Sequence, residues 1–337
     1  MNARAFVRSL SIAGAVFCVV GATSFVGCAL FQSEQVAKGR ELYNHYCSHC
    51  HGENGRQNEG YNWSSMPDPK PKDLANKSEM STFTDREIFD TISRDMKDTS
   101  PEVGDKIGDD EFGVPTMPTF KYTLAEEEIW SVVAYVRTLH GMKLTFNIEE
   151  RKKEIDRALD EAQARFDEAK NAYDTAEQKA NDEAEKSGKD VDDEAYAKEM
   201  AALGTAKKEL DQAKNAQENF AKRPKYAQIQ RPDLTMKPEQ ASELASLGKR
   251  LYSNKYGCNA CHALGEEGGK VGPALDRAGF RLNPVWVYRW IKYPQAMKGE
   301  TRMPNLGISD PDAKAISTYL STLRAPRPEQ VADKPGS

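Results

Sequence analysis

Residues 47–52 read CSHCHG and residues 258–262 read CNACH, so the pattern Cys-x-x-Cys-His occurs twice in this chain of 337 residues. Three kinds of chemistry use a Cys-x-x-Cys core: a redox-active dithiol, half of a zinc site, and covalent attachment of haem c. The histidine directly after the second cysteine favours haem, because attachment of haem c requires that residue. The recurrence of the pattern predicts two such sites.

Zinc and dithiol chemistry are the alternatives. Four thiolates can share one zinc ion, but the two cysteine pairs are separated in the sequence by enough residues for a complete domain and a coiled coil. A dithiol enzyme, in turn, would need neither His51 nor His262. We therefore expect two covalently bound haem c groups. The expected attachment sites are Cys47, Cys50, Cys258 and Cys261.

The N-terminus has the composition of an export signal. Arg4 and Arg8 precede residues 9–31, which contain no charged side chain. Residues 25–28 (FVGC) resemble a bacterial lipobox, which predicts lipidation of Cys28 and anchoring of a lipoprotein to a membrane. The alternatives are a retained membrane anchor, since about 20 apolar residues span a bilayer, and plain secretion. All three predict a location outside the cytoplasm, on the periplasmic side of a bacterial membrane.

The cysteine count and the net charge limit which disulfides and which partners we expect. Cys18 lies in the expected signal, Cys28 is the lipidation candidate, and the other four cysteines belong to the two motifs. No cysteine is left for a structural disulfide, although an oxidising compartment would permit one. The net charge is −5 at pH 7, and this acidity argues against a nucleic-acid partner.

The middle of the chain differs from both ends. Residues 148–222 are rich in Ala, Glu, Lys, Asp and Gln and contain no proline. Apolar residues recur there in alternating steps of about four and three, which is a heptad pattern. Because Gly188 and a charge cluster interrupt the pattern, we expect an antiparallel coiled-coil hairpin, with one continuous dimerising helix as the alternative. The hairpin would act as a spacer or as a docking arm. The two apolar seams run through Ile155, Leu159, Ala162, Phe166, Ala169, Tyr173, Ala176 and Ala180, and through Tyr196, Leu203, Ala206, Leu210, Ala213 and Phe220.

The surroundings of the two Cys-x-x-Cys-His motifs are similar. A short amphipathic helix is expected before each motif, and a Met-Pro step follows each one, at Met117 and Met303. A second helix is expected after each Met-Pro step. Thr123 and Glu126 form a capping box that predicts the start of the first of these helices, and Ser309 is expected to begin the other.

In the order of these motifs, both blocks resemble class I c-type cytochromes, a small all-α fold in which the first helix carries Cys-x-x-Cys-His and the last helix packs across it. The resemblance implies an all-α chain of two class I cytochrome c domains joined by the helical hairpin. The expected divisions are a signal or anchor at 1–32, domains at 33–146 and 224–326, the hairpin at 147–223, and a disordered tail at 327–337.

The resemblance also implies which residues hold the haem groups. In that family the cysteines form thioethers, the histidine is the proximal iron ligand, and the methionine of the Met-Pro step is the other axial ligand. The proline of a Gly-Pro pair supplies the carbonyl that accepts the histidine N–H and orients the ring; in the first domain Pro69 and Pro71 are alternatives for this role. The implied iron ligands are His51, Met117, His262 and Met303, and the Gly-Pro pair is Gly272 and Pro273.

Other methionines and histidines compete for the axial positions. A buried core methionine is the alternative interpretation of either Met-Pro residue, and a pair of histidines could replace a His/Met pair. The methionine rivals are Met66, Met80 and Met96 for the first site and Met297 for the second, and the histidine rivals are His45 and His140.

Gly39 and Tyr43 match the contact that this family makes between its first and last helices, where a glycine permits close approach and an aromatic ring packs beside it. In the second domain the corresponding glycine, Gly248, stands farther ahead of its motif. The sequence leaves this second contact open.

Together these features predict a dihaem c-type cytochrome that transfers single electrons between respiratory redox partners, such as an oxidase, a reductase or a quinol-oxidising complex. With both axial positions filled, the iron has no open position for a substrate, so we expect an electron-transfer protein and no enzyme. One alternative is a cytochrome subunit of a larger membrane oxidoreductase complex. The other is a dihaem cytochrome c peroxidase.

Overall fold

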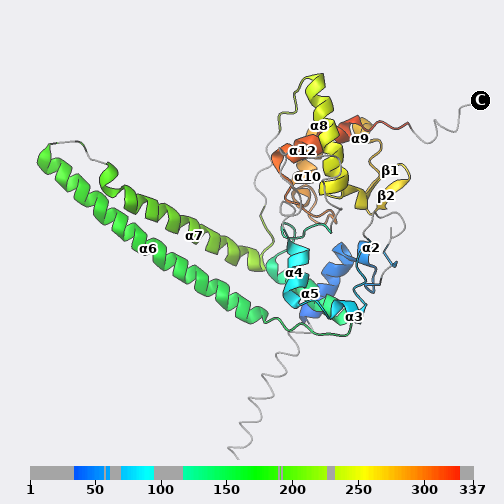
Figure 1. Cartoon of the computed structure of the whole chain (residues 1–337), viewed down its shortest axis with the longest axis horizontal. Coiled ribbons are helices and arrows are strands. Elements are labelled where there is room, and N and C mark those ends of the chain that lie inside the picture. The colour runs from blue at the N-terminus through cyan, green and yellow to red at the C-terminus, as the bar shows by residue number, and fades with distance from the viewer. Residues whose placement is uncertain are drawn as a thin grey trace, which may run out of the picture.

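The computed structural model describes residues 34–56, 58–60, 70–94, 117–188, 190, 193–225 and 232–326. In these ranges two mainly helical domains lie next to each other, and a long helical hairpin projects away from them (Figure 1). The expected all-α fold is confirmed, with one short two-stranded hairpin as an addition. None of the described helices is long and apolar enough to cross a membrane. The predictions for Cys18, Cys28, Met66, Pro69, Met96 and the C-terminal tail concern residues outside the described ranges.

The first domain starts with a helix over residues 34–46, which runs almost directly into the first motif. Its last helix, α5 (Glu126–Leu139), crosses this first helix, where Gly39 lies against the backbone of Ser131. The further elements are α2 (Ser48–His51), α3 (Lys77–Met80), α4 (Asp85–Ser93) and α5 (Glu126–Leu139).

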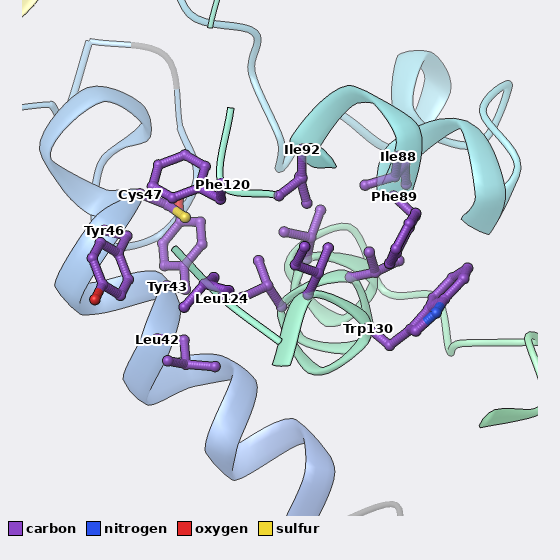
Figure 2. Packing of buried hydrophobic residues seen from close by; sticks show 14 of the residues in the cluster. Leu42, Tyr43, Tyr46, Cys47, Ile88, Phe89, Ile92, Phe120, Leu124 and Trp130 are labelled. Atoms are coloured by element: carbon purple, nitrogen blue, oxygen red, sulfur yellow. The ribbon is translucent and has the colours of Figure 1, made fainter. Parts of the chain in front are cut away.

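Aromatic side chains fill much of this core. Trp130 of α5 is fully buried and stacks on Phe89 and on Phe146, with ring centroids 4.3 and 3.6 Å away. Figure 2 shows Tyr43 and Cys47 at the other end of the same cluster, so the core extends without a break to the first motif. Each buried aromatic ring removes a large apolar area from water, so this cluster contributes strongly to the stability of the first domain.

The start of α5 differs from the prediction. The sequence assigns a capping box to Thr123 and Glu126, but the helix begins at Glu126 with Ala125 as its N-cap. Glu128 completes the first turn, because its carboxylate accepts a hydrogen bond from the Ala125 N–H at 3.1 Å. Thr123 is therefore free for a different contact, which reaches into the second domain.

A buried ion pair connects the core to the hairpin. The Arg137 Nε lies 2.5 Å from Asp85 Oδ1, and both side chains are almost fully buried. The other Asp85 oxygen accepts hydrogen bonds from the backbone N–H groups of Thr145 and Phe146, at 2.7 and 2.9 Å. Because these residues lead directly into the hairpin, Asp85 fixes the point at which the hairpin leaves the first domain.

The hairpin consists of α6 (Ile148–Ser187) and α7 (Ala197–Ala221), with a short 3₁₀ turn, η3 (Asp193–Tyr196), before α7. Gly188 ends α6 in a left-handed conformation (φ 65°), which a glycine adopts without strain. The two helices lie side by side along their length, as Figure 1 shows. The predicted antiparallel hairpin is thus confirmed, and the alternative of one continuous helix is wrong.

Both predicted apolar seams face the partner helix. Ala162 and Ala180 of α6 and Ala206 and Leu210 of α7 are buried, and the remaining seam residues are buried or half-buried. Small residues at these positions let the helices approach closely. Met200 of α7 is 51% exposed.

The base of the hairpin belongs to the core of the first domain. Ile148 and Ile155 of α6 and Phe220 of α7 are buried in the same cluster as Trp130. At the surface, Arg223 forms a two-armed ion pair with Glu128 of α5, at 2.8 and 3.0 Å. The hairpin therefore returns the chain to its starting point, beside α5.

The second domain has a similar plan. Its first helix, α8 (Pro238–Arg250), packs against its last helix, α12 (Asp310–Thr322), which Ser309 caps as predicted. A short strand pair follows the second motif. The elements between α8 and α12 are the π-helical turn η4 (Leu251–Lys255), the 3₁₀ turn η5 (Cys258–Ala260), β1 (His262–Leu264), β2 (Glu267–Lys270), α9 (Ala278–Arg281), α10 (Pro284–Lys292) and α11 (Pro294–Met297).

Each domain contains the same tight helix crossing. A Cβ atom added to Gly39 would lie 1.8 Å from the backbone oxygen of Ser131, and one added to Gly248 would lie 2.1 Å from that of Ala315. Real Cβ atoms never approach another atom so closely, so only glycine fits at either position. The contact that the sequence left open for Gly248 is therefore present.

The aromatic partner of each crossing is also repeated. Tyr43 packs against Tyr135 with ring centroids 5.1 Å apart, and Tyr252 packs against Tyr319 at 5.7 Å. Tyr43 precedes Cys47 by four residues, whereas Tyr252 precedes Cys258 by six. The π-helical turn η4 and Gly257, whose φ is 57°, lie in this longer segment and accommodate its extra length.

Replacing Gly248 by Ala is expected to destabilise the second domain by about 1–3 kcal/mol or more, because the new methyl group would overlap backbone atoms of α12 that have little room to move. The measurement is urea unfolding of the full-length protein followed by circular dichroism. Gly204→Ala in α7 is the matched control, since a Cβ there meets nothing within 4 Å. This control is expected to be neutral or to stabilise α7 by up to about 1 kcal/mol. Equal midpoints for both variants would contradict a tight crossing.

Candidate functional site

Both Cys-x-x-Cys-His motifs line one continuous cavity between the two domains. Its volume is about 930 Å³, near the upper end of the range for ligand pockets in proteins. Each domain contributes its two cysteines, its motif histidine and the methionine of its Met-Pro step, Met117 or Met303. The sequence predicted two sites far apart along the chain; in the fold they open onto each other.

The two motif histidines are oriented in the same way. His51 Nδ1 lies 3.1 Å from the backbone oxygen of Lys72, and His262 Nδ1 lies 2.8 Å from that of Pro273. A carbonyl oxygen only accepts hydrogen bonds, so each Nδ1 carries the proton and each Nε2 keeps a free lone pair. Burial lowers the pKa of both histidines, which favours this neutral form. Each ring thus presents an unprotonated nitrogen that is able to bind a metal.

The carbonyl partner of His51 corrects one prediction. The sequence offered Pro69 or Pro71, by resemblance to the Gly-Pro pair of the second motif, but the acceptor is the carbonyl of Lys72. Pro71 lines the cavity without making this bond. A main-chain acceptor leaves no signature in a side chain, so the sequence could not identify it.

In the second domain Gly272 forms the seat of the imidazole ring. A Cβ at this position would lie 2.2 Å from His262 Cε1 and 2.5 Å from Nδ1. The ring therefore packs directly on the bare backbone of Gly272, while Pro273 holds its N–H. This arrangement fits the predicted role of the pair in orienting His262.

The thiols of the two motifs meet in the cavity. Cys50 and Cys261 are joined by a side-chain hydrogen bond, which together with burial raises the pKa of Cys50 well above its usual range. Burial raises the pKa of Cys47 and of Cys258 to about 12. These three thiols stay protonated at neutral pH, whereas the hydrogen bond with Cys50 lowers the pKa of Cys261. Within the described ranges, no group of three or more His, Cys, Asp or Glu side chains is arranged to hold a metal ion.

The axial candidates can be compared directly in the cavity. Met117 and Met303 both line it, each directly before a proline. The rival Met80 lines it as well, but is 3% exposed and packed in the core of the first domain. Met297 does not reach the cavity lining.

The rival histidines are engaged elsewhere. His140 is buried at the end of α5, with its Nδ1 3.0 Å from the backbone oxygen of Leu74. His45 lies on the first helix and contacts the segment around Thr301 and Arg302 of the second domain. Neither side chain is among those that line the cavity.

The rest of the lining suits a large, flat, mainly apolar group with a negative edge. Arg94 reaches the cavity, and its buried Nε has no hydrogen-bond partner among the described residues. An unpaired buried guanidinium nitrogen favours an anionic group nearby, such as a carboxylate. The donor set, the apolar walls and this cation together fit haem c. The apolar lining includes Leu74, Ile88, Ile92, Val132, Val136, Leu275, Leu282, Val287, Ile291 and Leu320.

The two halves of the cavity are held together by direct contacts between the domains. The Asn305 N–H donates to Thr123 Oγ1 at 2.8 Å, and both residues are buried. Gly307 lies against the ring of Tyr122, where an added Cβ would be 2.4 Å from Cε2. Asn305 follows the Met303-Pro304 step closely, so this contact fixes the methionine segment of the second domain against the first domain.

Two segments of the chain match family models. Residues 36–140 match the model described as cytochrome c, and residues 243–320 match the model described as cytochrome c oxidase, cbb3-type, subunit III. Both domains are of the cytochrome c type. Domains of this type imply covalently bound haem c and support a protein that transfers electrons. No curated protein and no solved structure matches the chain.

Replacing Thr123 by Val is expected to weaken the contact between the cytochrome domains by about 1–3 kcal/mol, because it leaves the buried N–H of Asn305 without an acceptor. Chemical unfolding of the full-length protein measures this loss. Thr175→Val on the exposed face of α6 is the control, and it is expected to change stability by less than about 0.5 kcal/mol. A Thr123→Val variant as stable as the control would show that the interdomain bond contributes nothing.

Proposed function

We propose that this protein is a dihaem c-type cytochrome that carries single electrons between redox partners. The observation that carries the proposal is the paired set of donors around one cavity: two thiols, a histidine with a free Nε2 and a methionine from each domain. In each set the thiols would hold the porphyrin through thioethers, and the histidine and methionine would bind the iron. The thioether residues are Cys47, Cys50, Cys258 and Cys261, and the axial ligands are His51, Met117, His262 and Met303.

When bound, haem c supplies reversible one-electron chemistry, and the chain decides how that chemistry is used. With haem bound, a histidine and a methionine from each domain would hold the iron, a ligand pair that raises the reduction potential and would leave no open position for peroxide. Lys72 and Pro273 hold the two histidines through backbone carbonyls. This arrangement favours an electron carrier over a peroxidase.

The contact between Cys50 and Cys261 favours electron exchange inside one molecule. These two residues are the second cysteines of their motifs, so the attachment sites of the two domains meet at this point. After partial reduction, we expect the two domains to equilibrate at a rate that does not depend on protein concentration. A rate that rises in proportion to concentration would indicate exchange between molecules.

The cellular setting is part of the same proposal. Residues 1–32 combine a basic start, an uncharged stretch and the lipobox-like Cys28, which supports export and lipid anchoring on the periplasmic side of a bacterial membrane. Respiratory complexes there, such as an oxidase, a reductase or a quinol-oxidising complex, are the proposed partners. If buffer without detergent or lipase releases the protein from washed membranes, the protein is not lipid-anchored.

The second candidate function is a cytochrome subunit of a larger membrane complex. The long exposed hairpin favours it, because the base is fixed to the first domain while the distal part projects away from both domains (Figure 1). If further subunits co-purify with the protein from detergent extracts, and a shortened hairpin abolishes their co-purification, the protein is a subunit of a complex. Purification of the intact chain alone would support the mobile carrier.

The haem content is the direct test of the proposed function. The purified, exported protein is expected to contain two haems per chain, with low-spin iron and the Met-to-iron band in its oxidised spectrum. Cys258→Ser combined with Cys261→Ser is expected to leave one haem, and the matched pair Cys47→Ser and Cys50→Ser is expected to leave the other. Haem staining, mass spectrometry and reduced-minus-oxidised spectra measure these results. A colourless wild-type protein would overturn the proposal.

A further inference from the structure

The charge of the chain is divided unevenly between its parts. Residues 224–326, the second domain, contain 15 lysines and arginines against 9 aspartates and glutamates, a net charge of +6. Residues 174–199, the distal end of the hairpin, contain 4 basic against 10 acidic residues, a net charge of −6. The rest of the hairpin, residues 147–173 and 200–223, contains 11 of each. All of the net negative charge of the hairpin therefore lies at its distal end.

The distal end presents this charge on its surface. Asp174, Asp182, Glu183 and Glu185 of α6 are exposed. Met200 near the start of α7 adds an apolar side chain that is 51% exposed. A pair of helices that served only as a spacer would need no excess of one charge at its end. Methionine is enriched at protein interfaces, and charge of one sign around it steers a partner of the opposite sign.

A surface of the opposite charge lies on the second domain. Phe280 of α9 is 57% exposed, and the guanidinium groups of Arg277 and Arg324 lie over its ring, 5.9 and 5.3 Å from the centroid. Arg281, the next residue, is exposed as well. Aromatic rings and arginines are enriched at protein interfaces. This surface, which we call the arginine face, consists of Arg277, Phe280, Arg281 and Arg324.

Backbone contacts hold the arginine face in place. The N–H of Gly279 donates to the carbonyl of Leu323 at 2.9 Å, and Arg277 Nε donates to the carbonyl of Ala325 at 3.1 Å. A Cβ atom at Gly279 would lie 2.2 Å from the backbone oxygen of Ser321, so α9 packs directly on the end of α12. A surface that is already ordered loses little conformational entropy when a partner binds.

The distal end and the arginine face of one molecule lie too far apart to meet. A helix rises 1.5 Å per residue, so Asp182 lies roughly 50 Å along α6 from the base that is fixed in the first domain. Figure 1 shows the hairpin projecting to one side of the molecule and α9 on the opposite side of the second domain. A distal end that contacts an arginine face therefore contacts that of another copy.

We propose that the distal end of the hairpin of one copy docks on the arginine face of a second copy. Carboxylates of α6 pair with the arginines, and Met200 packs on the ring of Phe280, a favourable contact between sulfur and an aromatic ring. Each copy carries one surface of each kind, so the contact is heterologous. Because Arg281 also lines the cavity, the docked hairpin lies beside the second candidate site. This inference goes beyond the proposed function.

Self-association of the wild-type protein is the first test. The purified full-length protein in a non-ionic detergent is followed by sedimentation, with protein absorbance as the signal. It is expected to associate in about 20 mM salt and to dissociate in about 500 mM salt, where exposed charges are screened. A protein that stays monomeric at low salt would overturn the inference, as would association that salt does not weaken.

Charge reversal at the distal end tests the first surface. Asp182→Lys combined with Glu185→Lys is expected to weaken self-association about tenfold or more, because lysines then face the arginines. The matched control is Asp160→Lys combined with Glu161→Lys. These residues are exposed, lie on the same helix and give the same change in net charge, but they lie outside the distal end. The control is expected to associate as the wild type does, and equal weakening in both double variants would overturn the proposal.

A mixing experiment tests both surfaces together. Arg281→Glu combined with Arg324→Glu is expected to weaken self-association as well. Mixing this variant with Asp182→Lys, Glu185→Lys is expected to restore association, because each variant keeps the surface that the other has lost. A mixture that stays monomeric, or an arginine face that binds only acidic proteins of another kind, would overturn the proposal. A wild-type protein without haem would overturn the proposed function instead, so the two failures are distinguishable.

Discussion

The architecture depends on one steric constraint, the contact of a glycine with the backbone of a crossing helix. Gly39 meets Ser131 and Gly248 meets Ala315, in each case at a distance that excludes any side chain. This contact brings the helix before each motif directly onto the last helix of its domain. The tyrosine one turn later then packs against the second helix, and the motif emerges at the edge of the cavity. These crossings therefore determine where both candidate sites lie.

The features that could be predicted are those that side chains encode locally. The Cys-x-x-Cys-His motifs, the Met-Pro steps and the heptad seams each consist of residue types at fixed spacing. In the described parts of the chain, residues of both motifs and both Met-Pro methionines line one cavity, and the seams are buried or half-buried. The carbonyl of Lys72 could not be predicted, because any residue offers a carbonyl. Thr123 was assigned to a helix cap, since its spacing to Glu126 suits one, yet it bonds to a residue far along the chain.

The relation between the domains also lay beyond the sequence. The expected hairpin permitted the two domains to meet but did not show how they dock; in the fold it returns the chain to α5, and both motifs line one cavity. The hydrogen bond from the indole N–H of Trp290 to Met303 Sδ shows the same limit, because it depends on how α10 packs against the following loop. Such pairings arise from tertiary packing, which local sequence patterns do not encode.

The base of the hairpin has a consequence for the order of folding. Phe220 of α7 belongs to the same buried cluster as Trp130, so the first domain lacks part of its interior until α7 has been synthesised and has returned. Closing so long a segment adds only a modest entropic cost, because that cost grows with the logarithm of its length, but contacts of such separation form slowly. Until α7 packs against α5, the core of the first domain around Trp130 therefore remains incomplete.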